Sequence, residues 1–188
     1  MLKTFEEMEH RDKILIFEYI IFMLVEWEKT IQPNITHPEF SFGKLKALKL
    51  LFFVVSVDAT RTEHKLLDIF NRFYSMTYGP VESEVYNAIQ NRETIFYDIK
   101  DRITILKSDR DFKLFDKLNN DIKLEINRSV NKLKVINPKI VDLPSYKLVD
   151  ITHKWPVWKN AMSIANILGR RSEIMEGQDI IESEKFYE

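Results

Sequence analysis

The stretch FYSMTYGPVESEVY, residues 73–86, joins two segments that both have the apolar spacing of helices. Gly79 can adopt backbone angles closed to other residues. Pro80 has a fixed φ and lacks the N–H that would stay unsatisfied at a first helical position. We therefore predict a helix corner at Gly79, with Pro80 opening the next helix. Glu82 and Glu84 would then lie in its first turn, where carboxylates interact favourably with the helix dipole.

Helices are predicted on both sides of this corner. The helix after it extends from Pro80 to about Asn91 and has Val81, Val85, Ala88 and Ile89 at helical spacing. The helix before it begins at the capping-box pair Thr60 and Glu63 and continues to Tyr74.

The first half of the chain contains two further predicted helices. Residues 10–29 have a wide apolar face, and prolines and polar residues in 31–40 indicate a loop. Ser41 is the predicted N-cap of the next helix. Three lysines lie near the start of that helix and are expected on a solvated face: Lys44, Lys46 and Lys49.

The second half combines one hairpin with several helices. Alternation in residues 92–110 predicts a short β-hairpin, with a helix as the alternative for its first part. Residues 118–133 form the clearest amphipathic pattern, behind polar residues 119–121. Short helices are expected up to His153, from Pro156 to Leu168 before Gly169, and from Asp179.

Length and composition favour one domain. The 188 residues are 45% hydrophobic and include only four glycines, which disfavours folds dense in hairpins. We predict a mainly α (α+β) fold, a compact multi-helix domain with a small β-hairpin insertion. Residues 1–188 form this single domain, with a core at about 10–168 and a C-terminal tail at 170–188.

Charge and cysteine content narrow the class of partner. The net charge is −1, which disfavours nucleic acid as a partner. The most apolar run, Ile14 to Val25, is shorter than the roughly 20 residues that span a bilayer. No signal-peptide pattern precedes or follows it, and the chain contains no cysteine, so a cytoplasmic protein is expected.

Motifs for catalysis and cofactors are absent from the sequence. The four histidines are scattered without metal-ligand spacing, and no glycine-rich phosphate loop or nucleophile motif occurs. We expect no enzyme, no metal and no cofactor. Carboxylate pairs, Glu82 with Glu84 or Glu6 with Glu9, remain candidates for acid–base chemistry if they are buried together.

Trp155 and Trp158 flank Pro156 and have two interpretations. Tryptophans combine a large apolar area with a polar N–H, so both are candidate interface anchors. Alternatively, both pack under the last helices.

Three stretches, in order, resemble the Panacea family, the SocA-like antitoxin domain. Residues 44–53 (KLKALKLLFF) are similar to its early Leu-x-Lys-Leu-Leu-Tyr helix. Tyr78-Gly79-Pro80-Val81 with Val85-Tyr86 forms the central match, and residues 152–158 resemble the later His-Lys segment that ends in tryptophan. The chain departs from the family pattern at Met76, where a tryptophan is frequent, and at Trp155, where a polar residue is common.

The resemblance implies a helical antitoxin of a bacterial or prophage toxin–antitoxin system. Such a protein neutralises a cognate toxin by direct protein–protein binding and is not an enzyme. An adaptor that delivers a target to a host protease is the alternative, followed by a helical enzyme that uses carboxylates. The oligomeric state is left open. Candidate partner-binding or motif residues are Tyr78, Gly79, Pro80, Val81, Val85, Tyr86, His153, Trp155 and Trp158.

Overall fold

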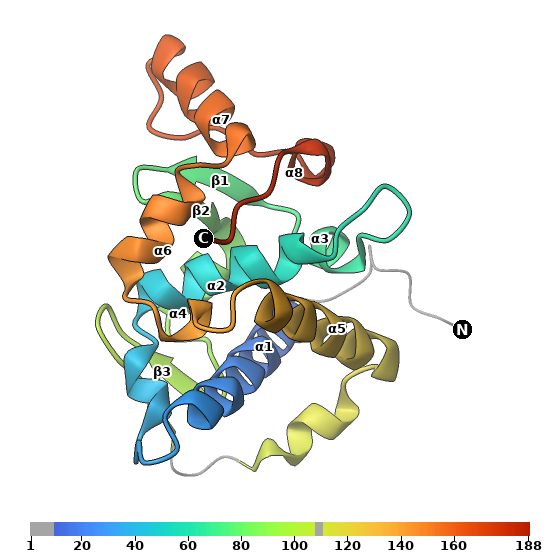
Figure 1. The fold of residues 1–188 in the computed structure, drawn as a ribbon, viewed down its shortest axis with the longest axis vertical. Coiled ribbons are helices and arrows are strands. Elements are labelled where there is room, and N and C mark those ends of the chain that lie inside the picture. Colours follow the sequence, from blue (N-terminus) through green and yellow to red (C-terminus); the bar gives the residue numbers. More distant parts are fainter. Residues whose placement is uncertain (1–9, 108–110) are drawn as a thin grey trace.

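The computed structural model describes residues 10–107 and 111–188, and its fold is mainly α, as predicted (Figure 1). Helix α2 (Lys44–Val57) lies in the centre and contacts α1, α3, α5, α6 and strand β2. Every residue from Lys46 to Val57 is buried. A helix that is apolar on all sides is stable only when other elements cover it, and this composition places α2 in the core.

The first helix is confirmed, and the start of the second is corrected. Helix α1 (His10–Ile31) packs against α2, α4 and α5. A short 3-10 helix, η2 (Pro38–Ser41), lies in the predicted loop. Ser41 does not cap α2; its hydroxyl donates to the buried carboxylate of Glu28 (2.5 Å), and Gly43 is the N-cap residue.

The predicted helix corner at Gly79 is wrong, because a β-hairpin occupies this stretch. Helix α3 (Lys65–Ile69) is short and is followed by antiparallel strands β1 (Phe73–Met76) and β2 (Gly79–Glu82). The φ of +90° at Gly79 suits the left-handed residue that follows a tight hairpin turn. Thr60 accepts a hydrogen bond from the Glu63 N–H, but this closes a turn ahead of α3.

Helix α4 (Ser83–Gln90) therefore begins three residues later than predicted. Glu82 is its N-cap, and the carboxylate accepts from the Val85 N–H at 2.8 Å. Pro80 lies in strand β2 instead of opening the helix.

The hairpin predicted in residues 92–110 is confirmed as β3 (Tyr97–Ile99) and β4 (Thr104–Leu106). Glu18 of α1 fixes its entry, because the carboxylate accepts hydrogen bonds from the backbone N–H groups of Ile95, Phe96 and Tyr97 at 2.7–3.0 Å. A 3-10 helix, η3 (Phe112–Lys117), then packs its phenylalanines against Phe22 and Phe96.

The other helices predicted in the second half are confirmed. They are α5 (Asn120–Ile136, capped by Asn119), α6 (Ser145–Thr152), α7 (Pro156–Ile167) and α8 (Gly177–Glu182), which begins two residues before the predicted Asp179. A 3-10 helix that was not predicted, η4 (Ile140–Asp142), lies between α5 and α6. In Figure 1, α7 projects from the top of the body, with α8 beside its base. No helix in residues 10–107 and 111–188 has the length and apolar character needed to cross a membrane.

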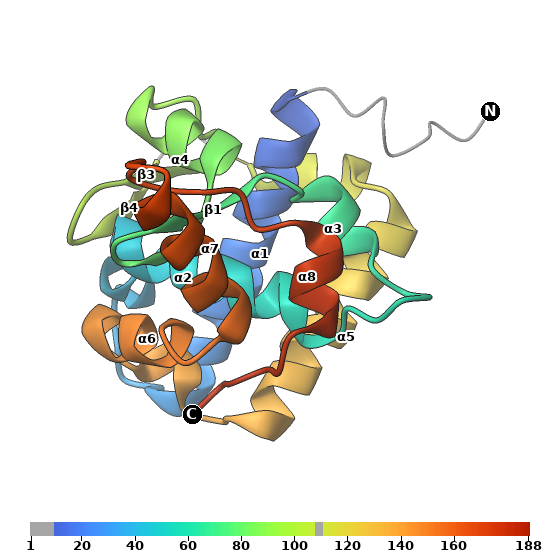
Figure 2. The ribbon, with the colours of Figure 1, turned by 90° about the horizontal axis from the view of Figure 1, so that it is seen from above.

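Residues 170–188, predicted as a tail, contribute to the core. The segment after α7 returns along β1, where Ser75 N–H donates to the Glu173 carbonyl and Met175 N–H to the Phe73 carbonyl (Figure 2). Met175, Ile180 and Tyr187 are all buried in the hydrophobic core.

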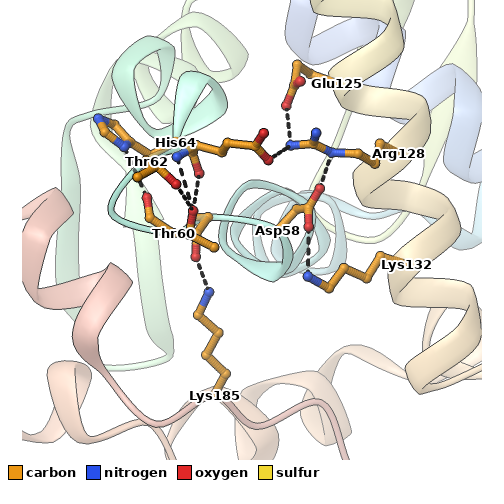
Figure 3. A network of polar contacts seen from close by, with 10 residues as sticks. Asp58, Thr60, Thr62, His64, Glu125, Arg128, Lys132 and Lys185 are labelled. Carbon is orange, nitrogen blue, oxygen red and sulfur yellow. Dashed lines mark hydrogen bonds and ion pairs between the residues drawn. The ribbon is translucent and has the colours of Figure 1, made fainter.

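A polar network holds α2, α5 and the C-terminal segment together (Figure 3). Asp58, at the end of α2, pairs with Arg128 and with Lys132 (2.7 Å) on α5. Lys185 donates to the carbonyls of Ser56 and Ala59, both at 2.7 Å. The end of the chain is thereby fixed to the central helix.

Candidate functional site

The three motif stretches, far apart in sequence, meet at one place in the fold. Helix α2 contacts β2 and α6, and α6 contacts β2. At their junction the Lys49 ammonium of α2 donates to the Pro80 carbonyl at 2.5 Å, and the end of α6 places Thr152 against Gly79. The sequence predicted the three stretches but not this convergence.

Lys49 is fully buried, which contradicts its predicted place on a solvated face. Burial lowers the pKa of its ammonium to about 7. No carboxylate lies within ion-pair distance of Lys49 in the described parts of the chain. The hydrogen bond of its ammonium is to the Pro80 carbonyl, so Lys49 links α2 to strand β2 of the hairpin on the buried side of the strand. Lys46, also buried, lies 3.6 Å from Glu28.

Gly79 fits where no other residue does. A Cβ atom at this position would collide with the Thr152 hydroxyl and would lie 3.1 Å from the Lys49 side chain. Its φ of +90° is also one that L side chains rarely adopt. The hairpin can therefore rest directly on α6.

Above this support, His153 and Trp158 stack with ring centroids 3.9 Å apart and an interplanar angle of 15°. The indole N–H of Trp158 donates to the Met76 carbonyl at 3.1 Å, which fixes the ring on the hairpin. Burial lowers the pKa of His153, the positive charge of Lys49 lowers it further, and a hydrogen bond with the Thr77 backbone opposes both.

The backbone of Met76 and Thr77 in the hairpin contacts this stack, and two side chains of the same hairpin are open to solvent. Tyr78, at the hairpin turn, is 66% exposed and Met76 is 39% exposed, while His153 and Trp158 are half-buried. We call the four residues Met76, Tyr78, His153 and Trp158 the hairpin surface. The hairpin surface thus consists of apolar and aromatic side chains, and its Trp158 ring is held in place by His153 and by the Met76 carbonyl.

A family model described as "Antitoxin SocA-like, Panacea domain" matches residues 48–159, more than half of the chain. The chain belongs to this family. The matched segment begins just before Lys49 and ends just after Trp158, so it contains the whole hairpin surface and its support. No curated protein and no solved structure matches the chain.

The other motif residues of this Panacea domain lie in the interior or on another side of the hairpin. Trp155 is fully buried, with its ring 4.8 Å from that of Phe52, and donates to the Phe186 carbonyl. It presents no surface to a partner, so the alternative of packing under the last helices is correct for Trp155. Val85 is buried, Val81 is half-buried, and Tyr86 packs under the Lys44 ammonium.

The candidate catalytic carboxylates are engaged in structural contacts. Glu82 is fully buried, and its two oxygens bind the Lys13 ammonium (2.6 Å) and the Val85 N–H. Burial raises the pKa of Glu84, but its pairs with Lys13 and Arg72 together outweigh burial and lower the pKa below its ordinary value. Glu6 and Glu9 lie outside the described residues. Within the described ranges, no cluster of three potential ligands could hold a metal ion.

Proposed function

We propose that this Panacea-domain protein is an antitoxin that neutralises a cognate toxin by binding it through the hairpin surface, in the bacterial cytoplasm. The observation that carries the proposal is the exposed pair of Tyr78 and Met76 beside a Trp158 ring fixed by two contacts. All of these residues lie in the segment that defines the antitoxin family.

Rigid aromatic groups are suited to this role for an energetic reason. Association costs free energy when side chains must be ordered, and preorganised groups reduce that cost. Trp158 is already held by the His153 ring and by the Met76 carbonyl. Tryptophan and tyrosine are enriched among the residues that dominate protein interfaces. Direct binding also requires no free catalytic group, and Glu82 and Glu84 are both paired with Lys13.

Coexpression with the product of the neighbouring gene tests the proposal. We expect the wild-type protein to relieve the toxicity of that product and to copurify with it. Trp158→Ala and Tyr78→Ala should abolish both effects without loss of folding. Tyr146→Ala is the matched control, because Tyr146 is 62% exposed on α6 and is not part of the hairpin surface.

Two outcomes would count against the proposal. Persistent toxicity, with no complex on purification, would remove the antitoxin role. Loss of the toxin polypeptide, in place of a stable inhibited complex, would favour the alternative of an adaptor that delivers its target to a protease.

A further inference from the structure

A groove of about 460 Å³ lies between α7 and α8, on a different part of α7 from the Trp158 contact. Apolar side chains form its floor: Val157, Ala161, Ile164 and Ile174. Carboxylates of α8 and the following segment form one rim: Asp179, Glu182 and Glu184. Figure 2 shows the two helices side by side from above.

The floor belongs to an apolar stripe that is only partly covered. Val157, Ala161, Ile164 and Leu168 recur at intervals of four, three and four residues along α7 and its C-cap, so they share one face. The first two are buried, whereas Ile164 is 48% and Leu168 is 54% exposed. A stripe of this kind normally packs against another helix. Helix α8, on the other side of the groove, is only six residues long, and Ile164 and Leu168 stay exposed.

The negative charge of the rim indicates which kind of partner would cover the exposed part of the stripe. The lining residues in the described ranges include three carboxylates and no lysine or arginine. Glu182 pairs with Arg61 at 2.7 Å, while Asp179 and Glu184 form no ion pair with other described residues. A partner with positive charges opposite this rim would gain electrostatic complementarity, which guides association and selects the partner.

We infer that the α7–α8 groove binds a basic amphipathic helix of the partner protein. The apolar face of that helix lies against Ile164 and Ile174, which line the groove, and its lysines or arginines face Asp179 and Glu184. Helix-in-groove recognition of this type uses apolar contacts spaced by three and four residues. The inference deepens the proposed function and depends on it only for the identity of the partner.

Two synthetic peptides test the groove without the toxin. Both have leucines at helical spacing; one has lysine and the other glutamate at every polar position. Calorimetric titration of the full-length protein should show saturable one-to-one binding of the lysine peptide and none of the glutamate peptide. The double variant Asp179→Lys/Glu184→Lys should weaken binding about tenfold or more.

Matched variants separate the groove from general electrostatics. The double variant Asp116→Lys/Asp150→Lys makes the same change of net charge at exposed carboxylates elsewhere and should leave binding unchanged. Ile164→Ser should weaken binding and Ile164→Leu should retain it, with thermal melts confirming that each variant folds. An equal loss in both charge variants, or no binding of the lysine peptide, would overturn the inference. Neither result would bear on neutralisation through the hairpin surface.

Discussion

The backbone of Gly79 lies so close to the Thr152 hydroxyl that no side chain fits between them. This approach seats the β1–β2 hairpin on the end of α6, with the buried Lys49 beneath it. It brings the hairpin turn beside His153, which follows α6, and beside Trp158 in the first turn of α7. The position of the hairpin surface therefore depends on Gly79, which is itself buried.

Gly79→Ala should destabilise the protein by about 2 to 4 kcal/mol, from steric overlap and from an unfavourable positive φ. Chemical denaturation measures the change. Adding Thr152→Ala should recover the steric part and leave the backbone part. Gly177→Ala is the control, because its Cβ would meet no described atom within 4 Å. Equal stability of Gly79→Ala and Gly177→Ala would contradict the packing described for Gly79.

Lys49 makes the stability depend on pH in a defined direction. Its pKa is 10.5 in the unfolded chain and about 7 in the fold, so between these values the unfolded state binds more protons. Stability should therefore rise with pH in this window, by at most about 1.4 kcal/mol per pH unit. The destabilising effect of the buried charge is fully present below pH 7 and disappears above 10.5.

Lys49→Met tests this dependence. Because methionine does not titrate, the stability of the wild type relative to the variant should increase from pH 7 to pH 10. The variant also leaves the Pro80 carbonyl without its donor, a cost of about 1 to 3 kcal/mol that does not change with pH. Denaturant unfolding at several pH values measures both terms. A constant difference across the window would show that Lys49 has an ordinary pKa.

The sequence predicted the elements whose signals are local. Helix α5 has its cap and its apolar spacing within one stretch, and the β3–β4 hairpin shows its alternation directly. Strand β1 was missed because Ser75, a polar residue, faces the interior and hides the period of two. The buried Ser75 hydroxyl donates to the Glu173 carbonyl and accepts from the Glu173 N–H. Because Glu173 lies about a hundred residues later, no local sequence pattern indicates these hydrogen bonds.

The sequence predicted the three motif stretches of the site but not how they are arranged in space. Pro80 has a fixed φ that suits both a helix start and an extended strand, so the Gly-Pro pair does not decide between them. Lys49 gave a signal that was misinterpreted. It lies between Leu48 and the apolar run Leu50–Val55, in the part of α2 where every residue is buried. Trp155 and Trp158 look alike in sequence, but only the three-dimensional packing separates the buried residue from the half-buried one.

The two tryptophans should therefore respond differently to truncation. Trp155→Ala removes a fully buried ring from contacts with Phe52 and Tyr187 and should cost about 3 to 5 kcal/mol. Trp158→Ala should cost less, because the ring is half-buried. Unfolding free energies of both variants measure the difference. A larger loss for Trp158→Ala would mean that Trp158 is structural and would weaken its assignment to a binding surface.

Glu18 should be among the most sensitive polar residues, since its carboxylate accepts three backbone hydrogen bonds at the entry to β3. Glu18→Ala leaves those buried N–H groups without an acceptor and should cost about 3 to 5 kcal/mol. Amide hydrogen exchange at Ile95, Phe96 and Tyr97 should accelerate more than exchange in α5. Glu26→Ala removes only a half-exposed pair with Lys29 and should change stability by less than about 0.5 kcal/mol. Unchanged exchange at residues 95–97 in Glu18→Ala would show that other contacts, and not this carboxylate, hold the hairpin on α1.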